Sequence, residues 1–295
     1  MSFDFVASVA FSDETAISFL RQKNVIRSHP PNCQSCSREM TIIKHNGGHI
    51  YRCPSHKNKK KSLRTGSFLE NSKLTYRDFV LICYSWSTER PVFRAVEEFS
   101  LSEHSVIQWY QYFRDICSKK LLATDYKIGG PNQIVQIDES LIAKAKNNVG
   151  RCPIQRWVFG GYDILTKKGF LVLVEDRTER TLLHYIQRYI RPGTIIHSDK
   201  WSAYHNIKNI PVHPPYQHFD VNHSLHFKDP ITGVHTNNVE CYWKNCKRRF
   251  KRMGGVQTST LPSHLDEFLW REMYGKDGTS AMDNILEQIA HFYPV

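Results

Sequence analysis

The pattern of apolar residues changes after residues 126–132, and this change most constrains the fold. The segment contains two glycines and a proline, which is typical of a linker. After it come short runs rich in β-branched and aromatic residues, which predict strands. These runs are residues 134–142, 156–163, 169–175 and 194–198. With a helix at about residues 179–190 and another from near Trp201, the order predicts an α/β fold in which helices cover a mixed sheet.

The remaining chain divides by composition into further segments. Residues 208–235 are rich in proline and predict a loop, whereas residues 237–252 predict a strongly basic helix. The tail from about residue 261 is predicted to be helical, as are residues 74–120. We therefore expect a tail with one short helix, a metal-binding segment, a helical module and an α/β domain. These regions are residues 1–30, 31–65, 66–125 and 126–295.

The net charge and the cysteines indicate which binding partners and which cellular compartment to expect. The chain of 295 residues carries a formal net charge of +12, which favours a polyanionic partner, with a basic protein that has none as an equal alternative. No segment has the roughly 18 apolar residues that span a bilayer. Asp13 and Glu14 interrupt the first apolar stretch, so we expect neither a secretory signal nor a membrane partner. The cysteines then lie in a reducing compartment, where close pairs favour metal over disulfides.

Two close pairs of ligand residues predict a zinc site near the amino terminus. The C-x2-C and C-x2-H pairs are Cys33, Cys36, Cys53 and His56. Three thiolates and one imidazole on two short knuckles suit a tetrahedral structural Zn²⁺, and the residues between the pairs suit a small hairpin. His45 and His49 remain alternatives to His56 as the fourth ligand.

Two features before the linker predict contacts with DNA. A basic run after the zinc site includes Lys59, Lys60 and Lys61, which suit phosphate contacts or a nuclear import signal; a solvated loop is the alternative. Residues 92–117 have the pattern of a helix-turn-helix whose second helix would enter the major groove. The expected buried side of that helix is Val106, Trp109, Tyr110, Phe113 and Ile116. A plain helical packing module explains the same pattern equally well.

Three carboxylates stand out by their places in the α/β domain. Asp138 lies inside an apolar strand, where a charge costs free energy unless it is paired or binds metal. Asp199 lies at the end of the fourth strand, and Glu240 near the start of the basic helix. Such acids can hold two Mg²⁺ ions for phosphodiester chemistry. Helix capping is the alternative for Asp199, a helix-dipole role is the alternative for Glu240, and Glu139 points to the opposite face as a weaker candidate.

The helix at residues 237–252 is predicted to carry two different stripes. Its apolar stripe, expected to pack on the sheet, is Val239, Trp243, Cys246, Phe250 and Met253. The adjacent stripe begins with Glu240 and continues with Lys244, Lys247, Arg248 and Lys251. A carboxylate followed by a basic row suits a metal centre beside a phosphate track, and a solvated face is the alternative.

At these residues the chain resembles the Merlin-type DDE transposases of eukaryotes and their bacterial insertion-sequence relatives. Besides the zinc-ribbon cysteines, the matching stretches are residues 62–86, 136–140, 196–204, 221–224 and 235–250. Several ordered motifs at matching separations make the resemblance specific over roughly residues 33–252. It implies that residues 126–295 form an RNase H-like DDE catalytic domain, preceded by a zinc ribbon and a helix-turn-helix-like, DNA-binding module.

The resemblance also implies an activity. A nuclear DNA transposase would use Asp138, Asp199 and Glu240 to hold Mg²⁺ or Mn²⁺. It would bind double-stranded DNA as a homo-oligomer at terminal inverted repeats, cleave there and join the freed 3′-hydroxyl to target DNA. The residues expected to position water or phosphate are His197, His223, His235 and Asn237. A domesticated DNA-binding protein without cleavage activity and a nuclease without strand transfer remain alternatives.

Overall fold

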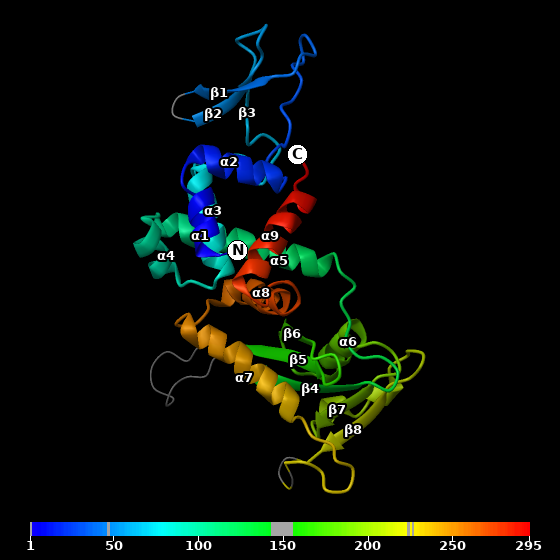
Figure 1. Cartoon of the computed structure of the whole chain (residues 1–295). Coiled ribbons are helices and arrows are strands. Elements are labelled where there is room, and N and C mark those ends of the chain that lie inside the picture. Colours follow the sequence, from blue (N-terminus) through cyan, green and yellow to red (C-terminus); the bar gives the residue numbers. More distant parts are fainter. Residues whose placement is uncertain (1, 46–47, 143–155, 223–224, 226) are drawn as a thin grey trace. The chain divides into compact units, whose positions relative to one another are not determined.

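The chain folds as two units (Figure 1), which we treat separately. The computed structural model describes residues 2–45, 48–142, 156–222, 225 and 227–295. Unit 1 comprises Met1–Ile116 with Met273–Val295, and unit 2 comprises Cys117–Glu272. The carboxyl-terminal residues thus group with unit 1, whereas the sequence pattern assigned everything after the linker to one domain. Over the described ranges, no helix has both the length and the apolar character needed to cross a membrane.

Unit 1 begins with two helices where the sequence predicted a tail with one short helix. Helix α1 spans Phe3–Val9 and helix α2 spans Asp13–Gln22. A capping box starts α2, because the hydroxyl of Ser12 accepts from the backbone N–H of Thr15 and the hydroxyl of Thr15 accepts from the backbone N–H of Ser12. The prediction of a single helix was wrong because these residues carry little apolar pattern and the capping signal at Ser12 was not considered.

A small antiparallel sheet follows α2. Its strands are β1 (Thr41–His45), β2 (Gly48–Arg52) and β3 (Lys60–Ser62), with β2 in the middle. Strands β1 and β2 form the hairpin that the sequence predicted between the two Cys/His pairs. Tyr51 of β2 is buried, and its hydroxyl donates to the carbonyl of Arg27 at 3.3 Å.

The predicted helical segment of unit 1 is present. Its helices are α3 (Tyr76–Ser87), α4 (Val92–Phe99) and α5 (Glu103–Leu122), and the carboxyl-terminal α9 (Gly278–Phe292) packs against α3. All of the residues predicted to form the buried side of α5 are buried. Trp109, for example, packs edge-on against Phe79 of α3 with ring centroids 5.2 Å apart. The succession of α4 and α5 matches the order of a helix-turn-helix, whose DNA-reading role stays a prediction.

Unit 2 is built on a five-stranded mixed sheet with the order β6-β5-β4-β7-β8. The strands are β4 (Ile134–Leu141), β5 (Trp157–Asp163), β6 (Gly169–Val174), β7 (Ile195–Asp199) and β8 (Gln217–Val221). Strands β4, β5 and β6 are antiparallel neighbours, whereas β4, β7 and β8 run parallel. The first four strands confirm the sequence prediction.

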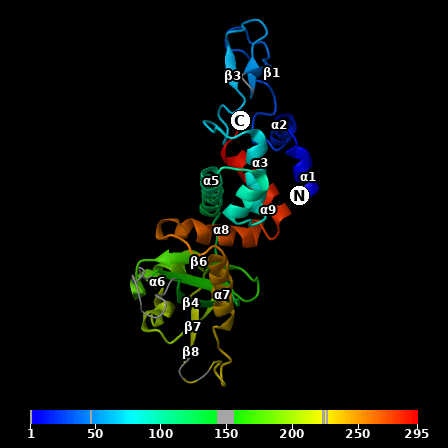
Figure 2. The same cartoon turned by 90° about the vertical axis from the view of Figure 1, so that its left-hand side faces the viewer.

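Helices cover both faces of this sheet (Figure 2). Helix α6 (Glu179–Tyr189) lies on one face, where Ile137 of β4 enters the hydrophobic core. Helix α7 (Asn237–Arg252) lies on the other face. It approaches β5 so closely that a Cβ at Gly160 would meet the ring of Trp243 at 2.8 Å, which explains a glycine in the middle of a strand.

Two local predictions in unit 2 are wrong. The helix expected from Trp201 is replaced by two short 3₁₀ turns, Ser202–Tyr204 and Ile207–Asn209, which end before Pro211. Strand β8 lies within the segment predicted to be a loop. The sequence signal of β8 is weak because only its second and fifth residues are buried and prolines precede it.

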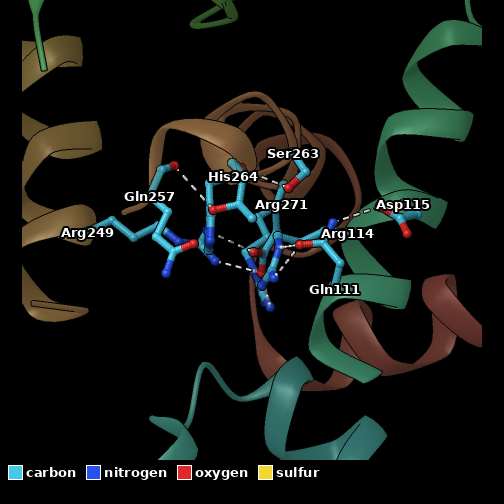
Figure 3. A network of polar contacts seen from close by, with 10 residues as sticks. Gln111, Arg114, Asp115, Arg249, Gln257, Ser263, His264 and Arg271 are labelled. Atoms are coloured by element: carbon cyan, nitrogen blue, oxygen red, sulfur yellow. Dashed lines mark hydrogen bonds and ion pairs between the residues drawn. The ribbon is translucent and has the colours of Figure 1, made fainter. Parts of the chain in front are cut away.

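Buried charges tie α7 to α8 (Leu261–Tyr274) inside unit 2. Arg249 and Arg271, both labelled in Figure 3, donate to the same oxygen of Glu267 at 2.7 and 2.9 Å. Glu267 is only 3% exposed, so the two guanidinium groups compensate a carboxylate that would be costly to bury alone. This network holds the carboxyl-terminal half of α7, while the other end of the helix carries Glu240.

Candidate functional site

Strand β4 divides its side chains between the two faces of the sheet. Successive residues of a strand point to opposite faces, so Gln136, Asp138 and Ser140 share the face that α7 covers. The contacts agree with this register. Oε1 of Gln136 accepts from two backbone N–H groups at the start of α7, at 2.9 and 3.2 Å, and Oγ of Ser140 accepts from Nζ of Lys247 at 2.6 Å. Asp138 lies between these two anchoring points.

Asp199 lies on the same face, at the end of the neighbouring strand. Strands β4 and β7 are parallel with Gln136 opposite His197, so Asp199 comes level with Asp138. One oxygen of Asp199 accepts from the backbone N–H of Trp201 at 3.0 Å. The alternative of helix capping is replaced by this single bond to the turn before Ser202–Tyr204, which does not require the second carboxylate oxygen.

Glu240 stands in the first turn of α7, where the helix dipole favours an acid. Its side chain is exposed, and one oxygen accepts from the hydroxyl of Thr236 at 3.3 Å. Burial, followed by the charges of two neighbouring carboxylates and of Glu240, raises the pKa of Asp138 to about 8. The two neighbours are Glu139 and Asp199. Acids from two strands and one helix therefore interact electrostatically at this place.

Glu139 lies on the opposite face of β4, in accordance with the period of the strand. Its carboxylate accepts a hydrogen bond from the hydroxyl of Tyr204, which is buried on the α6 side. Burial raises the pKa of Glu139, while the hydrogen bond from Tyr204 and the positive charge of Arg177 act in the other direction. Glu139 thus has partners of its own away from α7, and it remains the weaker ligand candidate.

Gln136 is a functional candidate that the sequence analysis missed. Its side chain is 1% exposed, and it caps the amino terminus of α7 from the neighbouring strand. Its amide nitrogen lies 3.3 Å from Nδ1 of His235. A polar residue in an apolar strand, two positions before Asp138, was the available signal. Gln136 fixes the start of α7, and with it Glu240, relative to Asp138.

We expect Gln136→Met to lower the affinity of the three acids for Mn²⁺ at least roughly tenfold, because α7 loses its cap and Glu240 its fixed position. The two N–H groups left without an acceptor should also reduce the free energy of unfolding by about 1–3 kcal/mol. The control is Ile137→Val, which costs about 0.5–1.5 kcal/mol on the other face of the same strand. Equal Mn²⁺ affinities of the two folded variants would show that Gln136 is only structural.

The residues predicted to position water or phosphate are partly brought together at the start of α7. Burial, with the charges of His235 and His218, lowers the pKa of His197 to about 4, so this imidazole is neutral. Asn237 is the first residue of α7, and its backbone N–H donates to Nδ1 of His235 at 3.3 Å. His223 lies outside the described residues. The described three can therefore offer neutral polar groups beside the acids.

Helix α7 shows the two predicted stripes with two exceptions. Its buried apolar residues include Val239, Trp243, Cys246 and Phe250. Met253, just after the helix, is exposed. The basic residues with exposed side chains are Lys244, Arg248 and Lys251. Lys247 instead turns toward the sheet to donate to Ser140, so it helps to join α7 to β4.

The predicted zinc ligands meet in unit 1. The ligand atoms of Cys33, Cys36, Cys53 and His56 all lie within 4.8 Å of one another. The backbone N–H of His56 donates to Sγ of Cys53 at 3.2 Å, and a backbone hydrogen bond at Ser35 is the main factor that lowers the pKa of Cys33 to about 6. Bonds of this kind stabilise thiolates, the form that binds metal. Three sulfurs and one ring nitrogen are a donor set that suits Zn²⁺.

The alternative fourth ligands have other neighbours. Nε2 of His45 lies 3.5 Å from Nζ of Lys60, and Nε2 of His49 lies 3.9 Å from a carboxylate oxygen of Glu14. His56 is therefore the histidine that the fold brings to the three cysteines. The exposed side chains of Lys59 and Lys60 lie close behind it in the sequence, and Lys61 is half-buried.

The carboxylate site fits a different kind of metal. It offers only oxygen donors, which suit the hard cations Mg²⁺ and Mn²⁺. Throughout the described part of the chain, no group of three acids is gathered as tightly as the Cys/His cluster. Wider spacing is expected of like charges that repel one another, and a bound cation would relieve that repulsion.

The segment that carries these acids is similar to known transposase domains. Residues 131–273 match the family profile of the ISXO2-like transposase domain. The chain is 25% identical over 122 residues to an uncharacterized transposase-like protein of Haemophilus influenzae, covering 41% of this chain and 93% of that protein. It is 26% identical over 219 residues to the male abnormal protein mab-31 of Caenorhabditis elegans, covering 63% of this chain and 49% of that protein. The chain thus spans about half the length of the nematode relative.

The fold class predicted from the sequence is confirmed. Unit 2 has a mixed sheet flanked by helices, as in the RNase H-like cores of transposases and integrases. A solved structure with some similarity is the catalytic core domain of BIV integrase, which is 14% identical with a TM-score of 0.34 and covers 49% of this chain and 84% of that one. The Merlin-type subfamily stays a prediction.

Proposed function

We propose that this chain is a DDE transposase of the Merlin type, which binds the inverted repeats of a transposon, cuts the DNA and joins the freed 3′-hydroxyl to a target. The matched transposase domain and the RNase H-like core support a DNA-processing function of the transposase type. The observation that carries the finer proposal is the placement of Asp138 and Asp199 on the sheet face that α7 covers, with Glu240 in the first turn of that helix.

In this proposal the three acids hold two divalent cations, Mg²⁺ or Mn²⁺. Bound there, the cations supply Lewis acidity and neutralise the charge that develops on the attacking and leaving oxygens of a phosphodiester. Asp138 contributes by giving up its proton, which its raised pKa makes unfavourable in the absence of a cation. Gln136 keeps Glu240 in place, and the neutral His197 is suited to hydrogen-bond water or a phosphate oxygen.

The other parts of the chain would select and hold the DNA. Zn²⁺ at the Cys/His cluster would order the small sheet of unit 1, so that Lys59, Lys60 and Lys61 can contact the phosphates of a double-stranded transposon end. Helices α4 and α5 would read the repeat as a helix-turn-helix. Pairing of two transposon ends implies a homo-oligomer on DNA. The basic run also suits a nuclear import signal, so a nuclear location is part of the proposal.

The test is incubation of the purified chain with DNA that carries the inverted repeats flanking its own gene, with Mg²⁺ or Mn²⁺. We expect cleavage at the repeat boundary and joining of the 3′-ends to a plasmid, both absent when Mg²⁺ and Mn²⁺ are left out and the zinc site stays loaded. Binding to the repeats without cleavage would support a domesticated DNA-binding protein instead. Cleavage without joining would support a nuclease.

The basic row of α7 predicts how the affinity for DNA depends on salt concentration. Replacing Lys244 and Lys251 by Gln should weaken DNA binding similarly on all sequences and reduce the salt dependence of the affinity by about one to two phosphate contacts. The matched control replaces Lys167 and Lys168 by Gln. These two lysines lie in the β5–β6 turn, at the end of the sheet away from Asp138. If both double variants keep the salt dependence of the wild type, the row of α7 only faces solvent.

A further inference from the structure

An arginine lies between two tryptophans near Asp199. Cζ of Arg177 lies 3.7 Å from the ring centroid of Trp157 and 5.0 Å from that of Trp201. Nε1 of Trp201 is 3.5 Å from the carbonyl oxygen of Arg177. We call these three residues the Trp–Arg–Trp stack. Trp201 belongs to the matching stretch 196–204, but the resemblance and the acids of the proposed site give the stack no role.

The stack is assembled at the edge of the sheet that also carries the acids. Trp157 opens β5 opposite Leu141, the last residue of β4, and it pairs on its other side with Val174 at the end of β6. Arg177 follows in the loop after β6. Trp201 follows β7, and its backbone N–H is the one that donates to Asp199. Trp157 points to the α6 face, opposite to Asp138, so the stack lies at the end of the sheet next to Asp199 and not among the three acids.

The geometry of the stack prepares the guanidinium for one kind of ligand. A guanidinium that stacks on an aromatic ring does so with its planar face, and its N–H donors, which lie in the plane, stay available to a ligand. Arg177 is half-buried and Trp201 is 39% exposed, so the stack reaches the surface. A guanidinium held in this way matches the oxygens of a phosphate in a bidentate manner and loses little side-chain freedom on binding.

The negative charges of the nearby acids explain why a positively charged side chain is useful here. A phosphodiester that approaches Asp138, Asp199 and Glu240 is repelled by the carboxylates until cations compensate them. Arg177 acts on Glu139, the neighbour of Asp138 on the other face of β4, because its positive charge opposes the rise in the pKa of Glu139. A positive group at this edge attracts the DNA backbone toward a site that is otherwise acidic.

We infer that the Trp–Arg–Trp stack is a phosphate-binding site, in which the N–H donors of Arg177 bind one phosphodiester of the DNA strand next to the bond that is cut. The naming of DNA as the source of the phosphate rests on the proposed function. Arg177 is a binding group in this scheme, and Trp157 and Trp201 position it. Lysine cannot replace it, because an ammonium group has neither the planar face nor the paired donors.

The experiment measures binding of the full zinc-loaded chain to repeat duplexes in Ca²⁺, so that binding is scored without cleavage. Each duplex carries one neutral methylphosphonate linkage at a different position. The wild type is expected to lose about tenfold in affinity at one linkage beside the cleavage point, which corresponds to about 1.4 kcal/mol. Arg177→Met and Arg177→Lys are expected to lose about tenfold on unmodified DNA and nothing further at that linkage.

The matched control is Arg180→Met, which removes an exposed arginine in the first turn of α6. It should keep the wild-type pattern of methylphosphonate effects. Melting temperatures show which variants are folded. If Arg177→Met does not fold, the comparison is made with Arg177→Lys. A wild-type pattern in a folded Arg177 variant, or no sensitive linkage in the wild type, overturns the inference. If the wild type and the Arg177 variants bind DNA with the expected pattern but the wild type does not cleave DNA in Mg²⁺, only the proposed transposase function is wrong.

Discussion

Asp138→Asn, Asp199→Asn and Glu240→Gln are each expected to reduce DNA cleavage by roughly 10³-fold or more, while binding to the transposon end survives. Each change keeps the size of the side chain and removes one charge from the proposed metal site. The three groups act together on the same cations, so double variants should be little worse than single ones. Cleavage of a labelled repeat duplex, measured beside its binding affinity, checks both points.

The thermal stability of the same variants provides an independent test of the proposed metal site. Burial and the neighbouring acids raise the pKa of Asp138 from its ordinary value near 3.8 to about 8. Between these values the folded chain binds more protons than the unfolded chain, so stability without metal should fall as the pH rises from about 4 to 8. Asp138→Asn should remove this fall, and the variant should melt at a higher temperature than the wild type at pH 8 in a chelator.

An acid with a purely structural role would behave in the opposite way. Its loss would lower the melting temperature and leave the cleavage rate of the folded fraction intact. If Asp199→Asn melts early yet still cuts, Asp199 serves only the turn that includes Trp201. The third ligand must then be sought elsewhere, with Glu139 as the first candidate.

Loss of the zinc site is the second large effect that we expect. Purified protein should contain about one zinc per chain, and Cys33→Ser should lose both the metal and binding to the transposon end. The reason is that the three short strands of this segment bury few side chains, so the free energy of metal binding, about 10–16 kcal/mol in small zinc domains, is needed to fold them. Metal analysis and end-binding assays on the two proteins check the prediction.

The matched control for this variant is Cys241→Ser, which changes an exposed cysteine on α7 outside the cluster. It should retain the wild-type zinc content and affinity. A folded wild-type protein without zinc, or a Cys33→Ser variant with the zinc content of the wild type, would contradict the assignment of this site.

Local patterns were sufficient to predict the strands that carry the acids. Strand β4 begins with the β-branched residues Ile134, Val135 and Ile137, and Asp138 follows them, so both the strand and the unusual place of the acid are visible in the sequence. Close Cys/His pairs predicted the metal cluster of unit 1 because ligand spacing is local within each knuckle. The predicted stripes of α7 followed from the period of a helix.

Features that depend on distant parts of the chain could not be predicted in this way. Gln136 caps a helix that begins about a hundred residues later, and nothing near Gln136 in the sequence indicates that partner. The Trp–Arg–Trp stack combines residues from the ends of different strands, so it becomes visible only once the sheet is assembled. Strand β8 depends on β7 for its pairing and has little apolar pattern of its own.

The central claim is that Asp138, Asp199 and Glu240 form one centre for divalent cations, and its most direct test is a melting curve with Mn²⁺. For the zinc-loaded wild type, Mn²⁺ at about 100 times its dissociation constant should stabilise unit 2 by about 2.7 kcal/mol and raise its melting temperature. Asp138→Asn, Asp199→Asn and Glu240→Gln should each reduce this shift strongly. A wild type that Mn²⁺ does not stabilise, or variants that all keep the full shift, would contradict the claim.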